Sequence, residues 1–147
     1  MKLSIDTTLI ERLEGYLESL YPDEAAGLLL GRSANQQQGE IMEIITLPNN
    51  FEEGERYHRY TIDPMDMLRA ENAAVALDME VLGVFHSHPD HPARPSDYDL
   101  EYALPWFVYV ITSIRQGNAE QTLAWQLQED RSAFQEVQIN IKHMNKE

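Results

Sequence analysis

The sequence contains the stretch VLGVFHSHPDHPARPSDYD at residues 81–99. The run Val81–His88 carries apolar residues on both faces, which predicts a central strand covered by helices. Pro89 ends this strand because proline cannot donate a hydrogen bond to a neighbouring strand. Ser96–Ala103 then predicts a short helix, which Pro105 closes. The stretch therefore places a buried strand, a proline-containing loop and a short helix next to one another.

Further elements are predicted on both sides of this stretch. One amphipathic helix covers about Thr8–Leu20, where Thr8 and Glu11 resemble a capping box. A second helix runs to about Met79 and begins with Asp63 as N-cap and Pro64 at its first position. Strands are expected at Gly27–Gly31, Glu40–Leu47, Trp106–Ile114, Leu123–Leu127 and Val137–Ile141. This pattern predicts an α/β (α+β) fold, a single domain over residues 1–147 with a mixed central sheet flanked by helices.

The composition narrows the classes of function. The chain has 147 residues, with 11 Lys and Arg against 25 Asp and Glu, a net charge of −14. A surface this acidic repels phosphates and anionic lipids, so we expect neither nucleic acid nor a membrane as partner. The chain has no cysteine, which excludes disulfides and cysteine-ligated metal sites. Without a signal core or a long apolar run, a cytoplasmic location is expected.

The two histidines of the stretch form a candidate metal site. His86 and His88 are two residues apart on a predicted strand, so their imidazoles share one face with Cα atoms roughly 6.6 Å apart. Two imidazoles in this arrangement can converge on one divalent ion, and Asp99 in the next helix can add a carboxylate. Three protein ligands with a fourth position open are typical of a catalytic zinc site. The pattern Ser96-x-x-Asp99 also matches a helix capping box, and the two roles are compatible.

These residues together resemble a known enzyme family. His86-Ser87-His88-Pro89, followed after six residues by Ser96-x-x-Asp99, looks like the signature of the JAMM (MPN+) metallopeptidases. The stretch PDEAAGLLLG at residues 22–31 is similar to the family's glutamate segment and places Glu24 at the catalytic position. The resemblance covers most of the chain and implies a single MPN-like domain.

The resemblance also implies a role for each position. One Zn²⁺ ion would be held by His86, His88 and Asp99. Glu24 would act as general base, taking a proton from the zinc-bound water and passing it to the leaving amine. Ser96 would donate a hydrogen bond to that water or to the oxyanion of the tetrahedral intermediate.

The compact bacterial branch of the family fits this chain better than the polyubiquitin-cutting branch, whose insertions carry cysteines. The resemblance to that compact branch implies a peptidase or isopeptidase that cleaves the amide bond after the C-terminal Gly-Gly tail of a ThiS/MoaD-like, ubiquitin-like sulfur carrier. A Gly-Gly tail has no side chains, so it can lie extended in a narrow channel or pair with a strand edge. The carrier, the choice between peptidase and isopeptidase, and the oligomeric state stay open.

Two other interpretations compete with this one. The pattern His86-x-His88-x-Asp90-His91 looks like the metallo-β-lactamase motif, in which Asp90 and His91 build a second metal position. Against it, that fold needs a longer chain and more downstream histidines than His143 alone. The second alternative is a non-catalytic MPN-type interaction module that binds a ubiquitin-like partner without cutting it. A scaffold has no physical need for an open metal site, which weighs against this alternative.

Overall fold

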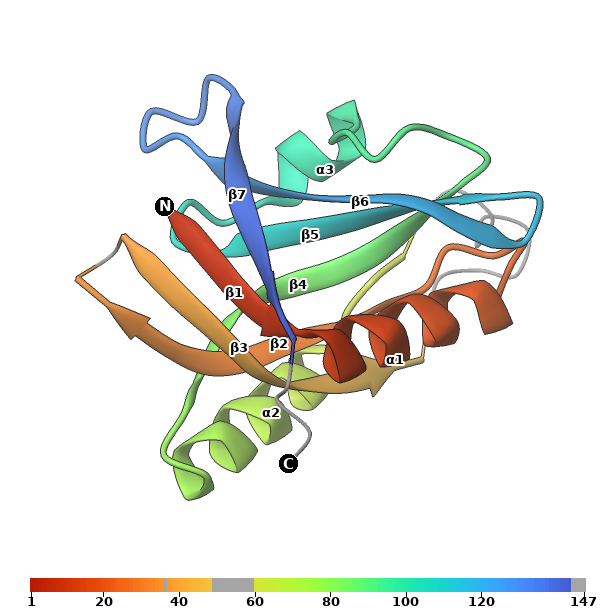
Figure 1. The fold of residues 1–147 in the computed structure, drawn as a ribbon. Helices are drawn as coiled ribbons and strands as arrows, with labels where there is room; N and C mark the ends of the chain where they lie inside the picture. The colour runs from red at the N-terminus through yellow and green to blue at the C-terminus, as the bar shows by residue number, and fades with distance from the viewer. Residues whose placement is uncertain (36, 49–59, 144–147) are drawn as a thin grey trace.

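The computed structural model describes residues 1–35, 37–48 and 60–143. This part of the chain forms seven strands and three helices (Figure 1). Their order is β1 (Lys2–Asp6), α1 (Thr7–Ser19), β2 (Ala26–Ala34), β3 (Gln38–Leu47), α2 (Pro64–Ala76), β4 (Glu80–Pro89), α3 (Asp97–Tyr102), β5 (Val108–Arg115), β6 (Asn118–Leu127) and β7 (Phe134–Lys142). None of the helices in the described ranges is long and apolar enough to cross a membrane.

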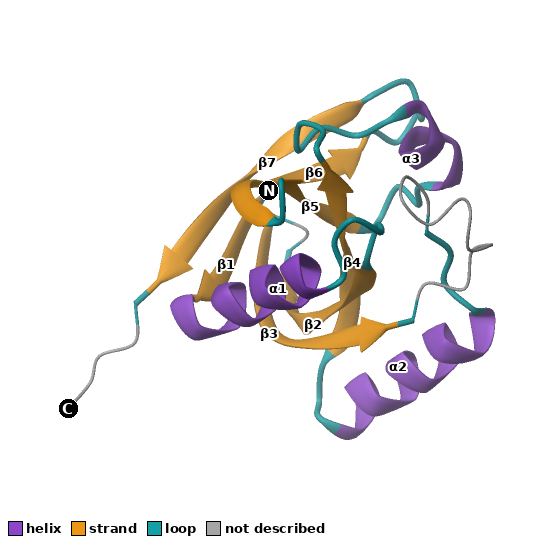
Figure 2. Ribbon diagram, turned by 90° about the vertical axis from the view of Figure 1, so that its right-hand side faces the viewer, coloured by secondary structure: helices purple, strands orange, loops and turns teal. Residues whose placement is uncertain are grey.

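The strands form a closed barrel rather than an open sheet flanked by helices (Figure 2). The strand order is β1-β3-β2-β4-β5-β6-β7, and β7 returns to pair with β1. The pairs β1/β3, β4/β5 and β1/β7 are parallel, and the other pairs are antiparallel. The predicted α+β class and mixed sheet agree with this architecture, but the sequence did not indicate the closure.

The N-terminal strand β1 accounts for part of this difference. It is only five residues long and leads directly into an amphipathic helix. Its alternation of polar and apolar side chains was therefore too short to predict a strand. The helix α1 begins at Thr7, and the side chain of Asp6 caps it by accepting a hydrogen bond of 2.7 Å from the amide of Leu9. The predicted capping box at Thr8 is therefore wrong by two residues.

An apolar cluster fills the interior of the barrel. The buried face of α1 consists of Leu9, Ile10, Leu13 and Leu17, as its helical spacing predicts. These side chains pack with buried residues from all seven strands, among them Leu29 of β2 and Phe85 of β4. Because this core draws on every strand, the barrel has a hydrophobic interior that does not depend on a ligand.

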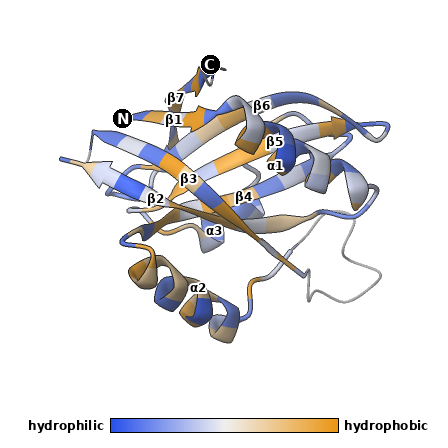
Figure 3. Ribbon diagram, turned by 60° about the horizontal axis from the view of Figure 1, so that its bottom comes forward, coloured by the Kyte–Doolittle hydropathy of each residue, from blue (hydrophilic) through white to orange (hydrophobic). Residues whose placement is uncertain are grey.

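The outer face of β2, β4 and β5 carries a second apolar cluster, formed with residues of α2 and α3. The helix α2 begins as predicted, because Asp63 caps it by accepting a 2.8 Å hydrogen bond from Met65 and Pro64 is its first residue. Its fully buried residues, however, are Ala70 and Ala74; Met67 is half-buried against the cluster, and Met65, Leu68 and Val75 are exposed. Figure 3 shows the resulting mixture of hydrophobic and hydrophilic residues along α2.

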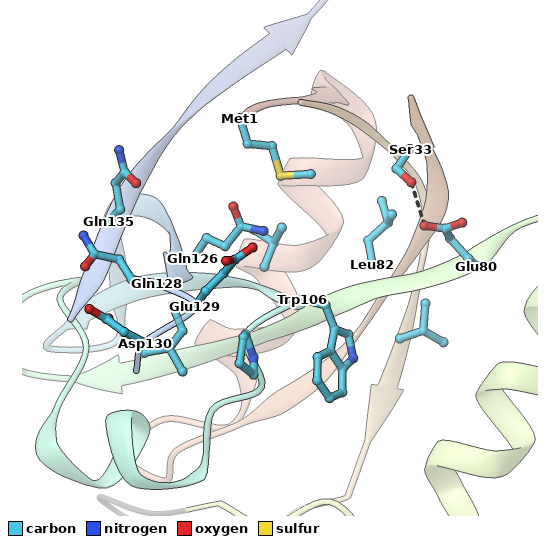
Figure 4. A pocket seen from close by; sticks show the side chains of 14 residues that line it. Met1, Ser33, Glu80, Leu82, Trp106, Gln126, Gln128, Glu129, Asp130 and Gln135 are labelled. Carbon is cyan, nitrogen blue, oxygen red and sulfur yellow. Dashed lines mark hydrogen bonds between the residues drawn. The ribbon is translucent and has the colours of Figure 1, made fainter. Parts of the chain in front are cut away.

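One end of the barrel contains a cavity of about 1130 Å³ (Figure 4). Met1, Glu80 and Leu82 are among its lining residues, together with the indole of Trp106. The strand β4 starts at this end, and His86 lies roughly 20 Å further along the strand. The two predicted metal-ligating histidines therefore lie toward the opposite end of the barrel.

Candidate metal centre

The strand β4 brings His86 and His88 to one face, as the period of a strand requires. This is the outer face of the barrel, since Phe85 between Val84 and His86 points into the interior cluster. The two imidazole centroids are 5.0 Å apart, and both side chains are buried. The predicted pairing of the two rings is confirmed.

The helix α3 supplies the carboxylate of Asp99 to the same place. One carboxylate oxygen, Oδ2, lies 3.1 Å from Nε2 of His88, and the other, Oδ1, lies 3.6 Å from Nε2 of His86. The amide of Ser96 also donates a 2.8 Å hydrogen bond to Oδ2. The Ser96 hydroxyl accepts a 3.1 Å hydrogen bond from the amide of Asp99, so the predicted capping box is present. This box fixes the carboxylate at the start of the helix.

Glu24 lies in the segment that leads into β2 and is 5% exposed. Its Oε1 atom is 3.2 Å from Nδ1 of His86. The neighbouring residue Ala25 is attached to β4 by two hydrogen bonds of 2.9 Å. The amide of Ala25 donates to the Ser87 hydroxyl, and the amide of Ser87 donates to the carbonyl of Ala25. This double contact holds Glu24 beside the two histidines.

Each imidazole faces an oxygen atom with its Nδ1 atom. Nδ1 of His88 lies 2.9 Å from the carbonyl oxygen of Pro92, which can only accept. Nδ1 of His86 faces the carboxylate of Glu24, which accepts when it is ionised. With a metal ion in the centre, each ring would carry its proton on Nδ1 and offer the lone pair of Nε2 to that ion. This is the arrangement that carbonyl and carboxylate partners impose on metal-ligating histidines.

The donor atoms of four residues converge on one small space. One ligand atom from each of Glu24, His86, His88 and Asp99 lies within 4.8 Å of the others. Nε2 of His86 is buried and has no hydrogen-bond partner among the residues that the structure describes. Such an atom is costly unless something binds it. Two imidazole nitrogens and a carboxylate are suitable ligands for a divalent transition metal, so the residues present fit a metal ion.

The charges in the centre support this interpretation. Burial raises the pKa of the Asp99 carboxyl, but the contacts with His86 and His88 outweigh burial and hold this pKa well below its usual range. Burial lowers the pKa of His86, but the charge of Asp99 and the contact with Glu24 outweigh it, so this pKa is raised. Asp99 is therefore ionised at neutral pH and offers a negatively charged oxygen to a cation.

The sequence matches a known protein family. The family described as prokaryotic homologs of the JAB domain (Prok-JAB) matches residues 7–128. The chain belongs to the JAB family. This membership confirms the resemblance on which the predicted site rests.

Two named relatives and a solved structure are similar to this chain. The chain is 29% identical over 116 residues to a Thermus thermophilus protein named "Probable TtuB-protein conjugate cleaving protease", covering 77% of this chain and 73% of that one. It is 29% identical over 119 residues to a Pyrococcus furiosus protein named "Desampylase", covering 81% and 76%. A solution structure of a protein from Desulfitobacterium hafniense superposes with a TM-score of 0.83 at 26% identity, covering 97% of this chain and 94% of that one.

The metallo-β-lactamase interpretation is wrong for this JAB chain. Asp90 directs its carboxylate to other groups, accepting hydrogen bonds from the hydroxyl of Tyr21 and the amide of Gln116. His91 is exposed, and its carbonyl accepts a 2.6 Å hydrogen bond from the hydroxyl of Ser113. Neither residue belongs to the converging group found in the described part of the chain.

Two residues next to the centre were missed by sequence reasoning. Ser87 holds the segment that carries Glu24. The sequence signal for this role was a small hydroxyl side chain, directed into the core, between two histidines. Tyr60 lies with its ring centroid 4.6 Å from that of His86, in a segment where no periodic pattern exists. Burial and the charges of Asp99 and Glu24 raise the pKa of Tyr60 well above its usual value, so its hydroxyl is neutral at physiological pH.

Proposed function

We propose that this JAB-family protein is a zinc-dependent peptidase or isopeptidase. It cleaves the amide bond that follows the C-terminal Gly-Gly tail of a small ubiquitin-like sulfur carrier of the ThiS/MoaD type. The observation that carries the proposal is the convergence of two Nε2 atoms and the Asp99 carboxylate, with Nε2 of His86 buried and lacking a hydrogen-bond partner within the described ranges. The names of the two relatives support a hydrolase that acts on protein conjugates.

Three residues would hold the ion: His86 and His88 through Nε2, and Asp99 through its carboxylate. A zinc ion held by three such ligands would lower the pKa of a bound water toward neutrality and polarise the scissile carbonyl. The Nδ1 contacts with Pro92 and Glu24 keep both rings in the tautomer that this binding requires.

Two further residues handle the proton and the developing charge. Glu24 takes a proton from the attacking water on its carboxylate and delivers it to the nitrogen of the leaving amine. The hydroxyl of Ser96 accepts from the amide of Asp99, so its own hydrogen points elsewhere and can donate to the oxyanion. Loss of one such donor typically slows hydrolysis by about 10²–10³-fold.

A defined substrate tests the activity. The purified protein loaded with Zn²⁺ is incubated with two forms of a Gly-Gly-tailed carrier, and the products are weighed by mass spectrometry. One form carries a short C-terminal peptide, and the other is linked through an isopeptide bond to a lysine side chain. We expect cleavage after the second glycine, and the form that is cut distinguishes peptidase from isopeptidase. A protein that binds the carrier and cuts neither form contradicts the proposal and favours an interaction module.

The metal ligation has a matched test in His91, which follows β4. We expect His88→Ala to lose stoichiometric zinc binding and hydrolysis, because it removes one of the Nε2 ligands. His91→Ala, three residues further on, removes an exposed imidazole outside the centre and should retain both. Zinc content after dialysis and activity are measured for both variants. Equal zinc content in the two variants contradicts the proposed ligand set.

A further inference from the structure

The aromatic ring of Tyr60 covers one side of the His86 imidazole. Their ring centroids are 4.6 Å apart and their planes are inclined by 34°. The centroid distance lies within the range of interacting aromatic pairs, and the two rings are tilted rather than parallel. Tyr60 belongs to neither β4 nor α3, because it lies in the segment that leads into α2. A fourth part of the chain thus reaches the metal centre, after β4, α3 and the segment of Glu24, although it contributes no atom to the converging group.

Two contacts fix Tyr60 in this position. Its carbonyl oxygen accepts a 3.4 Å hydrogen bond from the hydroxyl of Tyr98, which immediately precedes Asp99 in α3. Its side chain packs against the apolar cluster on the outer face of the barrel, whose buried members include Val84 and Tyr109. The backbone of Tyr60 is therefore tied to the helix that carries Asp99, and its side chain packs against a cluster that includes Val84 of the strand that carries His86.

The imidazole of His86 needs such a neighbour for a physical reason. Rotation about χ2 of a histidine is broad, so a side chain is held at one angle only by its contacts. The contact between Nδ1 and Glu24 fixes the direction of one ring atom. It leaves the tilt of the ring plane to packing, and the ring of Tyr60 lies against that plane.

We propose that Tyr60 is a positioning residue for the metal centre. Its flat ring sets the plane of the His86 imidazole so that Nε2 is directed at the ion, and it keeps water from that side of the ring. The proposal rests on the proposed function, since it assumes that His86 binds a metal. It predicts that the aromatic ring of Tyr60, rather than its hydroxyl or its volume, determines how well the centre binds metal.

Three variants and one control separate these properties. Tyr60→Phe keeps the ring, Tyr60→Leu keeps much of the apolar volume without the ring, and Tyr60→Ala removes both. Tyr102→Leu is the control, because Tyr102 contacts the ring of Tyr98, with the ring centroids 4.7 Å apart, but is 64% exposed. Zn²⁺ affinity is measured by competition with a chromophoric chelator, and the visible absorption spectrum of the Co²⁺ protein reports the ligand geometry. Thermal unfolding by circular dichroism verifies that each variant is folded.

We expect Tyr60→Phe and Tyr102→Leu to match the wild type in affinity and in Co²⁺ spectrum. Tyr60→Leu and Tyr60→Ala should bind Zn²⁺ about tenfold more weakly or worse, with a shifted Co²⁺ spectrum, as when the surroundings of a metal ligand are removed. Wild-type affinity and spectrum in Tyr60→Leu overturn the positioning role even if Tyr60→Ala fails to fold. A wild-type protein that binds neither metal would instead contradict the proposed function itself.

Discussion

The carboxylate of Asp99 contacts three groups at once, namely the two Nε2 atoms and the amide of Ser96. One oxygen, Oδ2, closes the helix cap and faces His88, while the other faces His86. The position of this side chain is thus set by backbone geometry before any ion binds. At the scale of single residues, the centre consists of side chains that other contacts already orient.

Glu24→Gln tests the proposed base. The amide oxygen of glutamine can still accept from Nδ1 of His86, so the orientation of that ring should persist. We expect the variant to keep its zinc content and to lose hydrolysis by about 10²–10⁴-fold, the usual contribution of a general base. Single-turnover cleavage and zinc content are measured side by side. Wild-type cleavage by this variant would show that Glu24 does not move the proton.

Metal affinity should fall as the pH is lowered. Zinc and the proton compete for Nε2 of His86, and only the neutral imidazole can bind the metal. Because the pKa of His86 is raised above its ordinary value of 6.5, its protonated form persists to higher pH than in an exposed histidine. We therefore expect zinc affinity, measured by calorimetric titration, to decline already as the pH falls through neutrality. An affinity that stays constant from about pH 8 to pH 6 would contradict this competition.

At the scale of elements, the strand β4 and the helix α3 together carry every predicted metal ligand. Strand periodicity was enough to predict that His86 and His88 share a face, and the proline and serine pattern predicted where α3 begins. Glu24 has no such local signal, because nothing within residues 22–31 distinguishes it from a surface acid. Only the family resemblance indicated it. Ser87 and Tyr60 act through contacts with distant segments, which periodicity does not reveal.

Ser96→Ala tests whether Ser96 does more than cap α3. Loss of an N-cap side chain costs about 1 kcal/mol of stability. Asp6 provides a matched control, since it caps α1 in the same way on another helix. We expect both Ser96→Ala and Asp6→Ala to unfold at lower denaturant concentration, while only Ser96→Ala loses hydrolysis, by about 10²-fold or more. If the two variants are equally active at saturating zinc, Ser96 only caps α3 and has no role in hydrolysis.

At the scale of the whole molecule, the closed barrel is the feature that the sequence did not predict. Closure depends on the pairing of β1 with β7, whose residues lie at opposite ends of the chain, such as Leu3 and Ile139. No local pattern encodes a pairing over that separation. The exposed side of α2 was also unexpected, because Leu68 and Val75 follow a helical period while the smaller Ala70 and Ala74 are the residues that pack. The half-buried Met67 packs beside them, so this face of α2 is not restricted to small side chains.

Removal of the metal should leave the barrel folded. The interior cluster contains none of the four residues of the metal centre, so its stability does not require the ion. We expect a chelator to abolish hydrolysis, with activity restored by added Zn²⁺, and the far-ultraviolet circular dichroism spectrum to stay unchanged. Cooperative unfolding on chelation would instead indicate a structural metal.

Leu13→Ala tests the opposite case, in which the interior is altered and the metal centre is left intact. Leu13 is fully buried in the interior cluster, so its truncation should lower the free energy of unfolding by about 2–5 kcal/mol. The folded variant should keep the zinc affinity of the wild type. A large loss of zinc affinity in the folded variant would show that the interior and the metal centre are coupled.

The strand directions have a practical consequence for attaching the protein to a surface. β1 is parallel to β3, and β3 and β4 both run antiparallel to β2, so β1 and β4 run in the same sense. Met1 therefore lies beside the cavity of Figure 4, at the end of the barrel where β4 begins. From there β4 runs toward the two histidines. Immobilising the protein on a sensor chip through its amino terminus would turn His86 and His88 toward the flowing solution. The tail of a candidate carrier could then reach these histidines without obstruction by the support.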